Sequence, residues 1–494
     1  MSVVKAVEIP VGHFGELSIG GGWVTPATSE TFDVVNPATE EVIARVATPS
    51  TKDADRAVDA ARRAFDEGPW PWLTPGERAE AVVRLCDAFE RRLSELNLAW
   101  ALESGAPLAH GELMNDGAGV AVWRHAVGLA PDLPWEEDRG DAIVRREPVG
   151  TVLAVLTYNG PVVLMGMKVV PALLAGCPVI VKHAPESQLT ARILADAAHE
   201  AGLPEGVLSF LPAGTEVTQY LVGHDGVDLV TVTGGVPIGV DVVQRTSGRL
   251  ARTILELGGK SPAILADDVD LDVVMESLAE GASSFLGQIC VSLSRIVAPR
   301  SRYDEVVAAL ASYYSGLRIG DPLDRDVQRG PLAVERARQR TETAVETARQ
   351  AGARVVVGGK RPAHLEQGWF YEPTLLADVS NDMAVARQEI FGPVTSVIPY
   401  DDIEDAVRIA NDTRYGLAAS VYAASTGAAL DIARRIRSGT VAVNTAGMSL
   451  TQPFGGVRCS GWGRECGAEG ILEFTDIKQI LVAGGASFLQ STLG

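Results

Sequence analysis

The chain has 494 residues, which is too long for one hydrophobic core and predicts two or three domains. Apolar residues make up 46% and charged residues 21%, the balance of a globular protein. The net charge of −20 argues against a surface that binds nucleic acid or an anionic membrane.

The N-terminal region is expected to hold a loose arm of about ten residues, turn-rich strands over residues 17–47, and two helices. The first 15 residues lack a basic region followed by an apolar stretch, so we expect no signal peptide. Ser50 and Asp53 have the spacing of a capping box at a helix start. Apolar residues then recur at helical spacing, with Ala54, Val58, Ala61 and Phe65 in one helix and Val82, Leu85, Phe89, Leu93 and Leu96 in a second helix after Pro75.

From Gly150 onwards, short β-branched runs alternate with helix-compatible stretches, a pattern typical of βαβ units and a parallel sheet. In the first such region we expect strands at 151–157, 178–181, 207–211 and 229–233, and a helix at 190–201. In a second region, 261–444, we expect strands near 262–265, 295–298, 354–357 and 395–399, and helices near 271–285, 303–314, 334–351 and 403–411.

Two segments fit neither unit. Residues 135–148 are expected to form a hairpin, and residues 477–493 form a C-terminal tail. Extended segments of this kind often pair with a neighbouring subunit, because an open strand edge offers unpaired backbone groups. A disordered tail is the alternative for the last ten residues.

Neither a membrane span nor a metal or disulfide framework is expected. The most apolar stretch, 161–181, is interrupted by Lys168, Pro171 and Pro178, and a buried helix leading into a strand fits it better. The five cysteines are scattered, without CxxC or Cys/His spacing. A reducing, cytoplasmic setting is therefore the simpler inference.

Two strand ends predict binding of an anionic ligand. The strand at 229–233 is followed by a glycine turn at 234–239 and a helix, so that free N–H groups and the helix dipole converge. This turn matches neither the GxGxxG fingerprint nor a P-loop, and an ordinary βα turn is the alternative. Lys182 ends another strand, at the edge where open α/β sheets bind ligands; a solvated lysine is the alternative reading.

Two further turns carry side chains that suit a carbonyl substrate and a nucleotide. Asn159, in the turn 158–161, can donate to a developing oxyanion together with a backbone N–H. Glu389 and Phe391 offer an acceptor for a ribose diol and a flat ring for a nicotinamide. Plain turns, the second with a buried Phe, are the alternatives.

Glu256 and Cys290 together predict covalent catalysis at a carbonyl carbon. Glu256 begins the glycine-rich segment 256–260, and Cys290 ends the segment 287–290 with its small and polar residues. A thiol, with a reference pKa of about 8.5, needs a base, a cation or backbone N–H groups to act as a thiolate. For the pair taken alone, an inert buried cysteine and a surface glutamate are the alternative.

Together and in this order, these segments resemble the aldehyde dehydrogenase superfamily over about residues 19–480. The matching segments are 36–39 (NPAT), 158–161 (YNGP), 233–239 (TGGVPIG), 256–262 (ELGGKSP), 287–290 (GQIC), 389–393 (EIFGP), and 453–456 with 460–464 (PFGG and SGWGR). The resemblance implies two Rossmann-like domains, an NAD(P)-binding domain at 1–133 and 149–258 and a catalytic domain at 259–476. It also implies a small β oligomerisation arm, 134–148 and 477–494, in a homodimer or homotetramer.

The resemblance implies NAD(P)-dependent oxidation of an aldehyde to a carboxylic acid. Cys290 would attack the aldehyde to give a thiohemiacetal, whose oxyanion is held by the Asn159 side chain and the Cys290 N–H. After hydride transfer, Glu256 would activate the water that hydrolyses the resulting thioester. Lys168 matches a family lysine near the site, with a supporting role.

The resemblance also assigns cofactor residues. Lys182 would bind the adenosine ribose, the turn at 234–239 would lie near the pyrophosphate, and Glu389 and Phe391 would contact the nicotinamide ribose and ring. The full set of expected cofactor contacts is Tyr158, Lys182, Thr233, Gly234, Gly235, Gly239, Leu257, Gly258, Glu389 and Phe391. Family members that prefer NAD often carry a glutamate three residues after the lysine, but Pro185 stands there and Glu186 follows one place late. We favour NAD, with NADP as the alternative.

The expected substrate pocket is roomy and apolar. Gly160 stands where many relatives place an aromatic residue, and the other expected lining residues are Leu164, Met167, Ile289 and Val291. We therefore expect medium-to-bulky apolar or aromatic aldehydes. The alternatives are a CoA-acylating dehydrogenase, against which Glu256 argues, a non-catalytic protein on the same fold, and a thioesterase or esterase, which leaves the nucleotide motifs unexplained.

Overall fold

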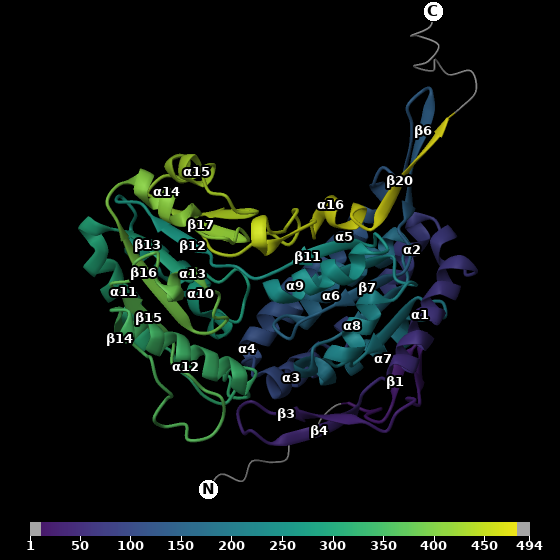
Figure 1. The fold of residues 1–494 in the computed structure, drawn as a ribbon, viewed down its shortest axis with the longest axis horizontal. Coiled ribbons are helices and arrows are strands. Elements are labelled where there is room, and N and C mark those ends of the chain that lie inside the picture. The colour runs from purple at the N-terminus through teal and green to yellow at the C-terminus, as the bar shows by residue number, and fades with distance from the viewer. Residues whose placement is uncertain (1–10, 482–494) are drawn as a thin grey trace, which may run out of the picture.

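The computed structural model describes residues 11–481, and it contains two large, mainly parallel sheets and one small antiparallel sheet. Figure 1 shows the two large sheets next to each other, with the small sheet projecting from the body near the C-terminus. This arrangement confirms the expected α/β class. The arm expected over the first ten residues lies outside the described residues.

The first large sheet has the strand order β19-β11-β10-β7-β8-β9-β1-β2, and the run from β11 to β9 is parallel. Its strands are β1 (Leu17–Ile19), β2 (Gly22–Val24), β7 (Val152–Val155), β8 (Val179–Lys182), β9 (Leu208–Leu211), β10 (Leu229–Thr233), β11 (Arg252–Glu256) and β19 (Gly461–Trp462). A separate hairpin joins β3 (Thr31–Val35) to β4 (Val42–Ala47).

Helices cover both faces of this sheet, because neighbouring residues of its parallel strands are apolar on either side. One face is covered by α1 (Thr51–Asp66), α8 (Thr215–Gly223) and α9 (Val236–Ser247), and the other by α2 (Pro75–Glu90), α3 (Leu93–Ser104), α5 (Val120–Leu129), α6 (Pro161–Ala175) and α7 (Gln188–Ala201). Between α3 and α5 lie α4 (Leu108–Gly111) and a π-helix, Glu112–Gly119.

The second large sheet has the order β14-β15-β16-β13-β12-β17-β18. Among its described strands, β14 pairs antiparallel with β15 and all other pairs are parallel. The strands are β12 (Pro262–Leu265), β13 (Arg295–Pro299), β14 (Arg354–Val357), β15 (Thr374–Ala377), β16 (Val394–Tyr400), β17 (Ala418–Tyr422) and β18 (Thr440–Val443). The helices around it are α10 (Leu271–Ser283), α11 (Tyr303–Ser315), α12 (Glu335–Gln350), α13 (Ala384–Arg387), α14 (Ile403–Asn411) and α15 (Thr426–Ala433). Every strand and helix expected in this region is present.

The small sheet pairs β6 (Ala142–Pro148) with both β5 (Glu136–Asp138) and β20 (Thr475–Leu481). The expected hairpin is therefore confirmed, and the C-terminal tail adds a third strand to it. Residues 482–494 of the expected arm lie outside the described residues.

One expectation needs correction, and one expected range can be compared with the strand pairing. The second helix ends at Glu90, and Leu93 and Leu96 belong to a new helix, because the backbone at Arg92 leaves helical geometry (φ −110°, ψ 13°). The expected catalytic range, 259–476, also includes elements that lie with the first sheet. In that range β19 pairs with β11, and α16 (Gly467–Leu472) packs against α6.

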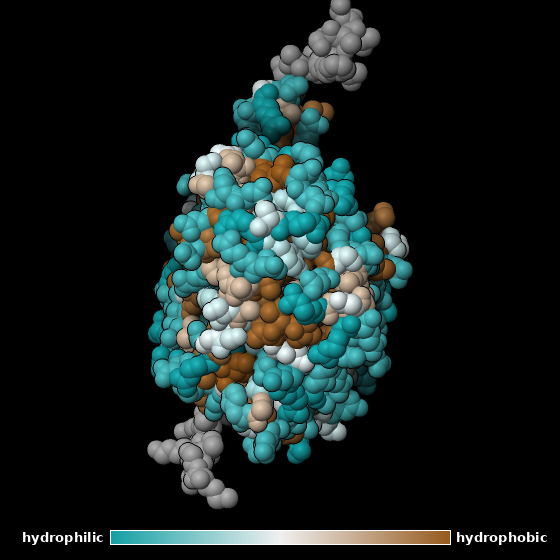
Figure 2. Space-filling view, turned by 90° about the vertical axis from the view of Figure 1, so that its left-hand side faces the viewer, coloured by the Kyte–Doolittle hydropathy of each residue, from teal (hydrophilic) through white to brown (hydrophobic). Residues whose placement is uncertain are grey.

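The outer surface of the second-sheet region is mainly hydrophilic. Figure 2 shows this face, which lies on the left of Figure 1, with apolar patches between larger polar areas. Within residues 11–481, no helix combines the length and apolar character that a membrane crossing requires.

Candidate active site

A cleft of about 310 Å³ lies where the two large sheets meet. The first sheet contributes turns at the carboxyl ends of β7, β10 and β11, the edge at which open α/β sheets bind ligands. The second-sheet region contributes the start of α12 and the segment 389–391. The cleft is lined by Thr157, Tyr158, Asn159, Thr233, Gly234, Gly235, Ile238, Leu257, Gly258, Cys290, Val334, Arg336, Arg340, Glu389, Ile390 and Phe391.

A second cavity of about 630 Å³ adjoins this cleft and shares several lining residues with it, among them Tyr158, Thr233 and Arg336. It extends to Lys182 at the end of β8, where burial lowers the pKa of the lysine to about 8. The helix α9 begins at this junction without a side-chain cap on its first N–H groups. The Thr233 hydroxyl is buried there and has no hydrogen-bond partner in the described part of the chain.

These features fit an extended anionic ligand such as a dinucleotide. The uncapped N–H groups of α9 favour phosphate, and the two joined cavities provide room on both sides of it. Gly239 allows close packing here, because a Cβ atom would lie 2.5 Å from Leu257 Cδ1. The sequence-predicted cofactor residues of this region are thus brought together.

Cys290 is half-buried and lines the cleft. The chain reaches it through a turn in which Phe285, Leu286 and Gly287 all have positive φ (46°, 53° and 66°). At Gly287 a Cβ atom would lie 2.5 Å from the Gly392 carbonyl oxygen, so the turn packs tightly against the segment after Phe391. Such a left-handed run is costly for non-glycine residues and is kept where the surroundings enforce it.

The thiol of Cys290 lies in anionic surroundings. Burial raises its pKa to about 12, and the carboxylates of Glu256, Glu389 and Glu465 add to this rise. At neutral pH the thiol is therefore protonated before a ligand enters, and its activation requires a change in the site.

Glu256 ends β11 and is buried, with 4% of its surface exposed. Neither carboxylate oxygen has a hydrogen-bond partner among residues 11–481. Burial raises the pKa of Glu256 well above its ordinary value, Glu465 raises it further, and Lys168 opposes the rise. At Gly455 a Cβ atom would come within 2.8 Å of Glu256 Oε1, so this glycine leaves space beside the carboxylate.

Lys168, which acts on Glu256 electrostatically, belongs to a buried polar group that includes one residue the sequence analysis missed. The Lys168 amine donates to the Thr231 hydroxyl (3.2 Å) and forms an ion pair with the Glu465 carboxylate. Both charged side chains are buried, and burial raises the pKa of Glu465 while Lys168 opposes that rise. The one available sequence signal for Glu465 is its place directly after the segment 460–464.

Asn159 lies in the cleft with its amide oriented by a neighbour. The Thr157 hydroxyl donates to Asn159 Oδ1 (2.6 Å), which occupies the amide oxygen and leaves the NH₂ group as a donor. Tyr158, which follows Thr157, donates its hydroxyl hydrogen to Gln288 Oε1 (3.1 Å), two residues before Cys290. The turn after β7 is thus fixed to the cysteine segment.

Glu389 and Phe391 line the same cleft from the other side. Glu389 Oε1 accepts a hydrogen bond from the Gly259 N–H (3.1 Å), and burial raises the pKa of Glu389. A Cβ atom at Gly258 would lie 1.9 Å from Glu389 Oε2, so a larger residue there would displace the Glu389 carboxylate. The Phe391 ring meets the Tyr158 ring edge-on, with centroids 6.3 Å apart.

The expected substrate-pocket residues divide into two groups. Leu164, Met167 and Val291 belong to one apolar cluster. Gly160, the residue directly before α6, is itself buried. Ile289 packs instead against a different cluster, which contains Tyr158, Phe285 and Phe391. The side chains on the two sides of Cys290 therefore point to different parts of the site.

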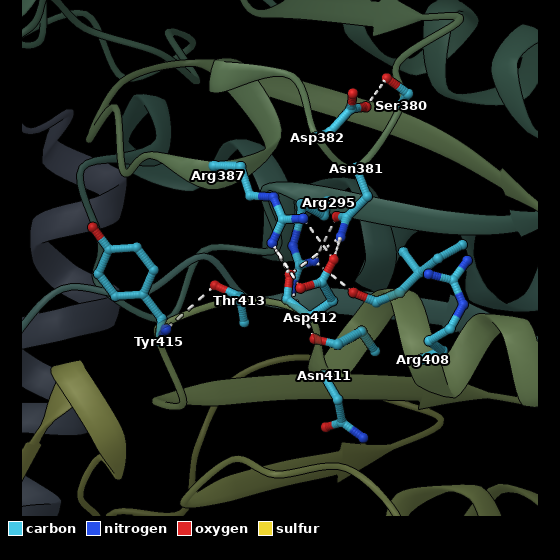
Figure 3. A network of polar contacts seen from close by, with 12 residues as sticks. Arg295, Ser380, Asn381, Asp382, Arg387, Arg408, Asn411, Asp412, Thr413 and Tyr415 are labelled. Atoms are coloured by element: carbon cyan, nitrogen blue, oxygen red, sulfur yellow. Dashed lines mark hydrogen bonds and ion pairs between the residues drawn. The ribbon is translucent and has the colours of Figure 1, made fainter.

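A buried arginine supports the turn that carries Glu256. Arg295, at the start of β13, donates to the carbonyl oxygens of Lys260 (3.0 Å), Ile409 (2.9 Å) and Ala410 (2.9 Å) and to Asn381 Oδ1 (3.0 Å). Figure 3 shows this guanidinium beside Asn381, Arg387 and Asp412. These bonds join the segment 256–260 to β13 and the end of α14.

Replacing Arg295 with Met is expected to destabilise the fold by about 3–5 kcal/mol, because it leaves buried carbonyl oxygens without their donor. Urea unfolding followed by circular dichroism measures the change. The control is Arg408→Ala on α14, whose exposed side chain pairs with Asp405 and should contribute less than about 1 kcal/mol. Equal effects of the two variants would contradict the supporting role of Arg295.

Comparisons with known proteins agree with this geometry. The family model "Aldehyde dehydrogenase family" matches residues 23–480. Geranial dehydrogenase of Castellaniella defragrans is 40% identical over 471 residues, which cover 94% of this chain and 98% of that protein.

Two solved structures are also close in fold. The crystal structure of a Mycobacterium tuberculosis aldehyde dehydrogenase complexed with NAD⁺ has a TM-score of 0.94 and 42% identity, covering 96% of this chain and 99% of that one. A cysteine-to-alanine mutant of aldehyde dehydrogenase C from Pseudomonas syringae, complexed with NAD⁺ and octanal, has a TM-score of 0.92 and 36% identity, covering 96% and 98%. With the family model matched over nearly its whole length, the chain belongs to the aldehyde dehydrogenase family and is an oxidoreductase that acts on aldehydes.

Proposed function

We propose that the protein oxidises apolar aldehydes to carboxylic acids with NAD⁺, through a thioester on Cys290 that water hydrolyses. The observation that carries the proposal is the arrangement around one cleft, where Cys290 and Asn159 line the wall and Glu256 acts on the cysteine electrostatically. Such a grouping provides a nucleophile, a hydrogen-bond donor for the oxyanion, and a base.

The first half of the reaction uses Cys290 and Asn159. The Cys290 thiol releases its proton to water in the cleft, and the sulfur then attacks the carbonyl carbon. The developing oxyanion receives hydrogen bonds from the Asn159 NH₂ group and the Cys290 N–H. The hydrogen bond from Thr157 favours this role, because it orients the Asn159 amide with its donors toward the cleft. Collapse of the thiohemiacetal as hydride departs leaves the acyl group on sulfur.

The second half uses Glu256. Because its carboxylate is buried and has no partner in the described residues, it can accept a proton from water that attacks the thioester. The buried Lys168–Glu465 pair is proposed to tune the charge of this carboxylate electrostatically. A CoA-acylating enzyme would not need such a base.

The two joined cavities are proposed to hold NAD⁺, which accepts the hydride when bound. Lys182 would bind at the adenosine ribose, the start of α9 at the phosphates, and Glu389 and Phe391 at the nicotinamide ribose and ring. The solved neighbours that carry NAD⁺ at 36–42% identity support this assignment.

The substrate is proposed to be a medium-to-bulky apolar or aromatic aldehyde. The expected lining residues Leu164, Met167 and Val291 all pack in one apolar cluster, which favours an apolar substrate. The geranial dehydrogenase and the octanal-bound structure support this class.

An aldehyde panel tests the proposed function. With NAD⁺, we expect kcat/KM for octanal and benzaldehyde to exceed that for succinic semialdehyde by at least about tenfold. The carboxylate of succinic semialdehyde would be buried in an apolar pocket without a partner, which is costly. Product analysis should find the free acid with or without CoA. Equal or better use of succinic semialdehyde would contradict the substrate class, and formation of acyl-CoA would contradict the hydrolytic step.

The small sheet is proposed to mediate assembly of a homodimer or homotetramer. Strand β20 exposes apolar side chains, with 66% of Ile477 and 74% of Leu481 accessible in the single chain. An edge strand with exposed apolar residues favours pairing with another copy.

A further inference from the structure

An ion pair spans the cofactor groove between the two large sheets. Arg336, the second residue of α12, pairs with Glu186 in the turn Pro185–Ser187 that follows β8. The Glu186 side chain is 9% exposed and that of Arg336 is 69% exposed, so the guanidinium lies at the surface of the groove. Arg336 lines both cavities.

This pair neutralises one of the two acidic residues that line the larger cavity. Its acidic lining residues are Glu186 and Asp241, and Asp241 is engaged by Arg245 (2.8 Å). The cationic Lys182 lies in the same cavity and forms no ion pair within the described range. A phosphate on the adenosine ribose would therefore meet two cationic groups, Lys182 and Arg336, while both carboxylates are already paired.

A free glutamate near the ribose would have the opposite effect. A carboxylate there accepts hydrogen bonds from the ribose hydroxyls and repels a 2′-phosphate. An arginine instead binds phosphate through charge-assisted hydrogen bonds. Which behaviour prevails depends on whether Glu186 is held by Arg336.

We propose that the Arg336–Glu186 pair sets coenzyme specificity, so that the protein binds NADP(H) as well as NAD(H). While paired, Glu186 does not repel the 2′-phosphate, and Arg336 contributes a direct contact to it. The inference rests on the proposed dinucleotide site, and coenzyme binding tests it without need of aldehyde turnover.

The experiment measures Kd for NADH and NADPH by coenzyme fluorescence in the wild type, Arg336→Ala and Glu186→Gln. The wild type should bind the two coenzymes with Kd values within about one order of magnitude. Arg336→Ala should weaken NADPH binding about ten- to a hundredfold more than NADH binding, because it removes a phosphate contact and frees Glu186. Glu186→Gln should shift the ratio of the two Kd values toward NADPH.

The matched control is Arg349→Ala on the same helix, whose exposed side chain pairs with Glu346 and lines neither cavity. It should leave the ratio of the Kd values unchanged, and a shift equal to that of Arg336→Ala would overturn the inference. So would an unchanged ratio in Arg336→Ala, or NADH binding without NADPH binding in the wild type. Failure of the wild type to bind either coenzyme would overturn the proposed function as well.

Discussion

Replacing Cys290 with alanine is expected to lower kcat for aldehyde oxidation at least about 10⁴-fold, because Cys290 is the one thiol among the described residues that line the cleft. Reduction of NAD⁺ with octanal, followed by absorbance, measures the loss. The affinity for NADH should remain near that of the wild type, since the larger cavity is not lined by Cys290.

The control for this variant is Cys86→Ala, which removes a thiol buried in α2 among the helices of the first sheet. It should keep most of the activity. Retention of more than about one hundredth of the rate by Cys290→Ala would contradict nucleophilic catalysis by this sulfur.

Replacing Glu256 with glutamine is expected to lower the steady-state rate about 10²- to 10⁴-fold while leaving a rapid burst of NADH equal to the enzyme concentration. The first hydride transfer precedes hydrolysis and does not need the base, whereas the thioester then persists. Stopped-flow absorbance resolves the burst from the slow phase. An unchanged steady-state rate would contradict the assignment of Glu256.

The same variant should also alter the pH profile. Burial raises the pKa of Glu256, so the carboxyl group stays protonated to higher pH than an exposed glutamate. The base form therefore appears as pH rises, and wild-type hydrolysis should fall as pH is lowered through that raised pKa. Glu256→Gln should lack this dependence in its slow phase, and an identical profile would count against the proposed role.

Much of the fold could be predicted because its strands are β-branched and bounded by turns. The strands that were missed show where this signal ends. β17 begins Ala418-Ala419-Ser420, a composition with low strand preference, yet it lies inside the second sheet, where tertiary pairing decides. The break between α2 and α3 was also missed, since Leu93 and Leu96 continue the apolar spacing and only the backbone at Arg92 reveals the turn.

The site could be predicted wherever a motif carries the side chain. Cys290, Glu256 and Asn159 stand in recognisable segments, and the structure places Cys290 and Asn159 in one cleft. Glu465 and Arg336 were not predicted. Their importance comes from partners about 300 and 150 residues away, Lys168 and Glu186, and such pairs are visible only in three dimensions.

The most direct test of the account is mass spectrometry of Glu256→Gln, quenched in acid after brief mixing with NAD⁺ and octanal. The peptide that contains Cys290 should gain the mass of one octanoyl group, and hydroxylamine should remove it. An acyl group on any other residue, or an unmodified Cys290 after a full burst of NADH, would contradict the account.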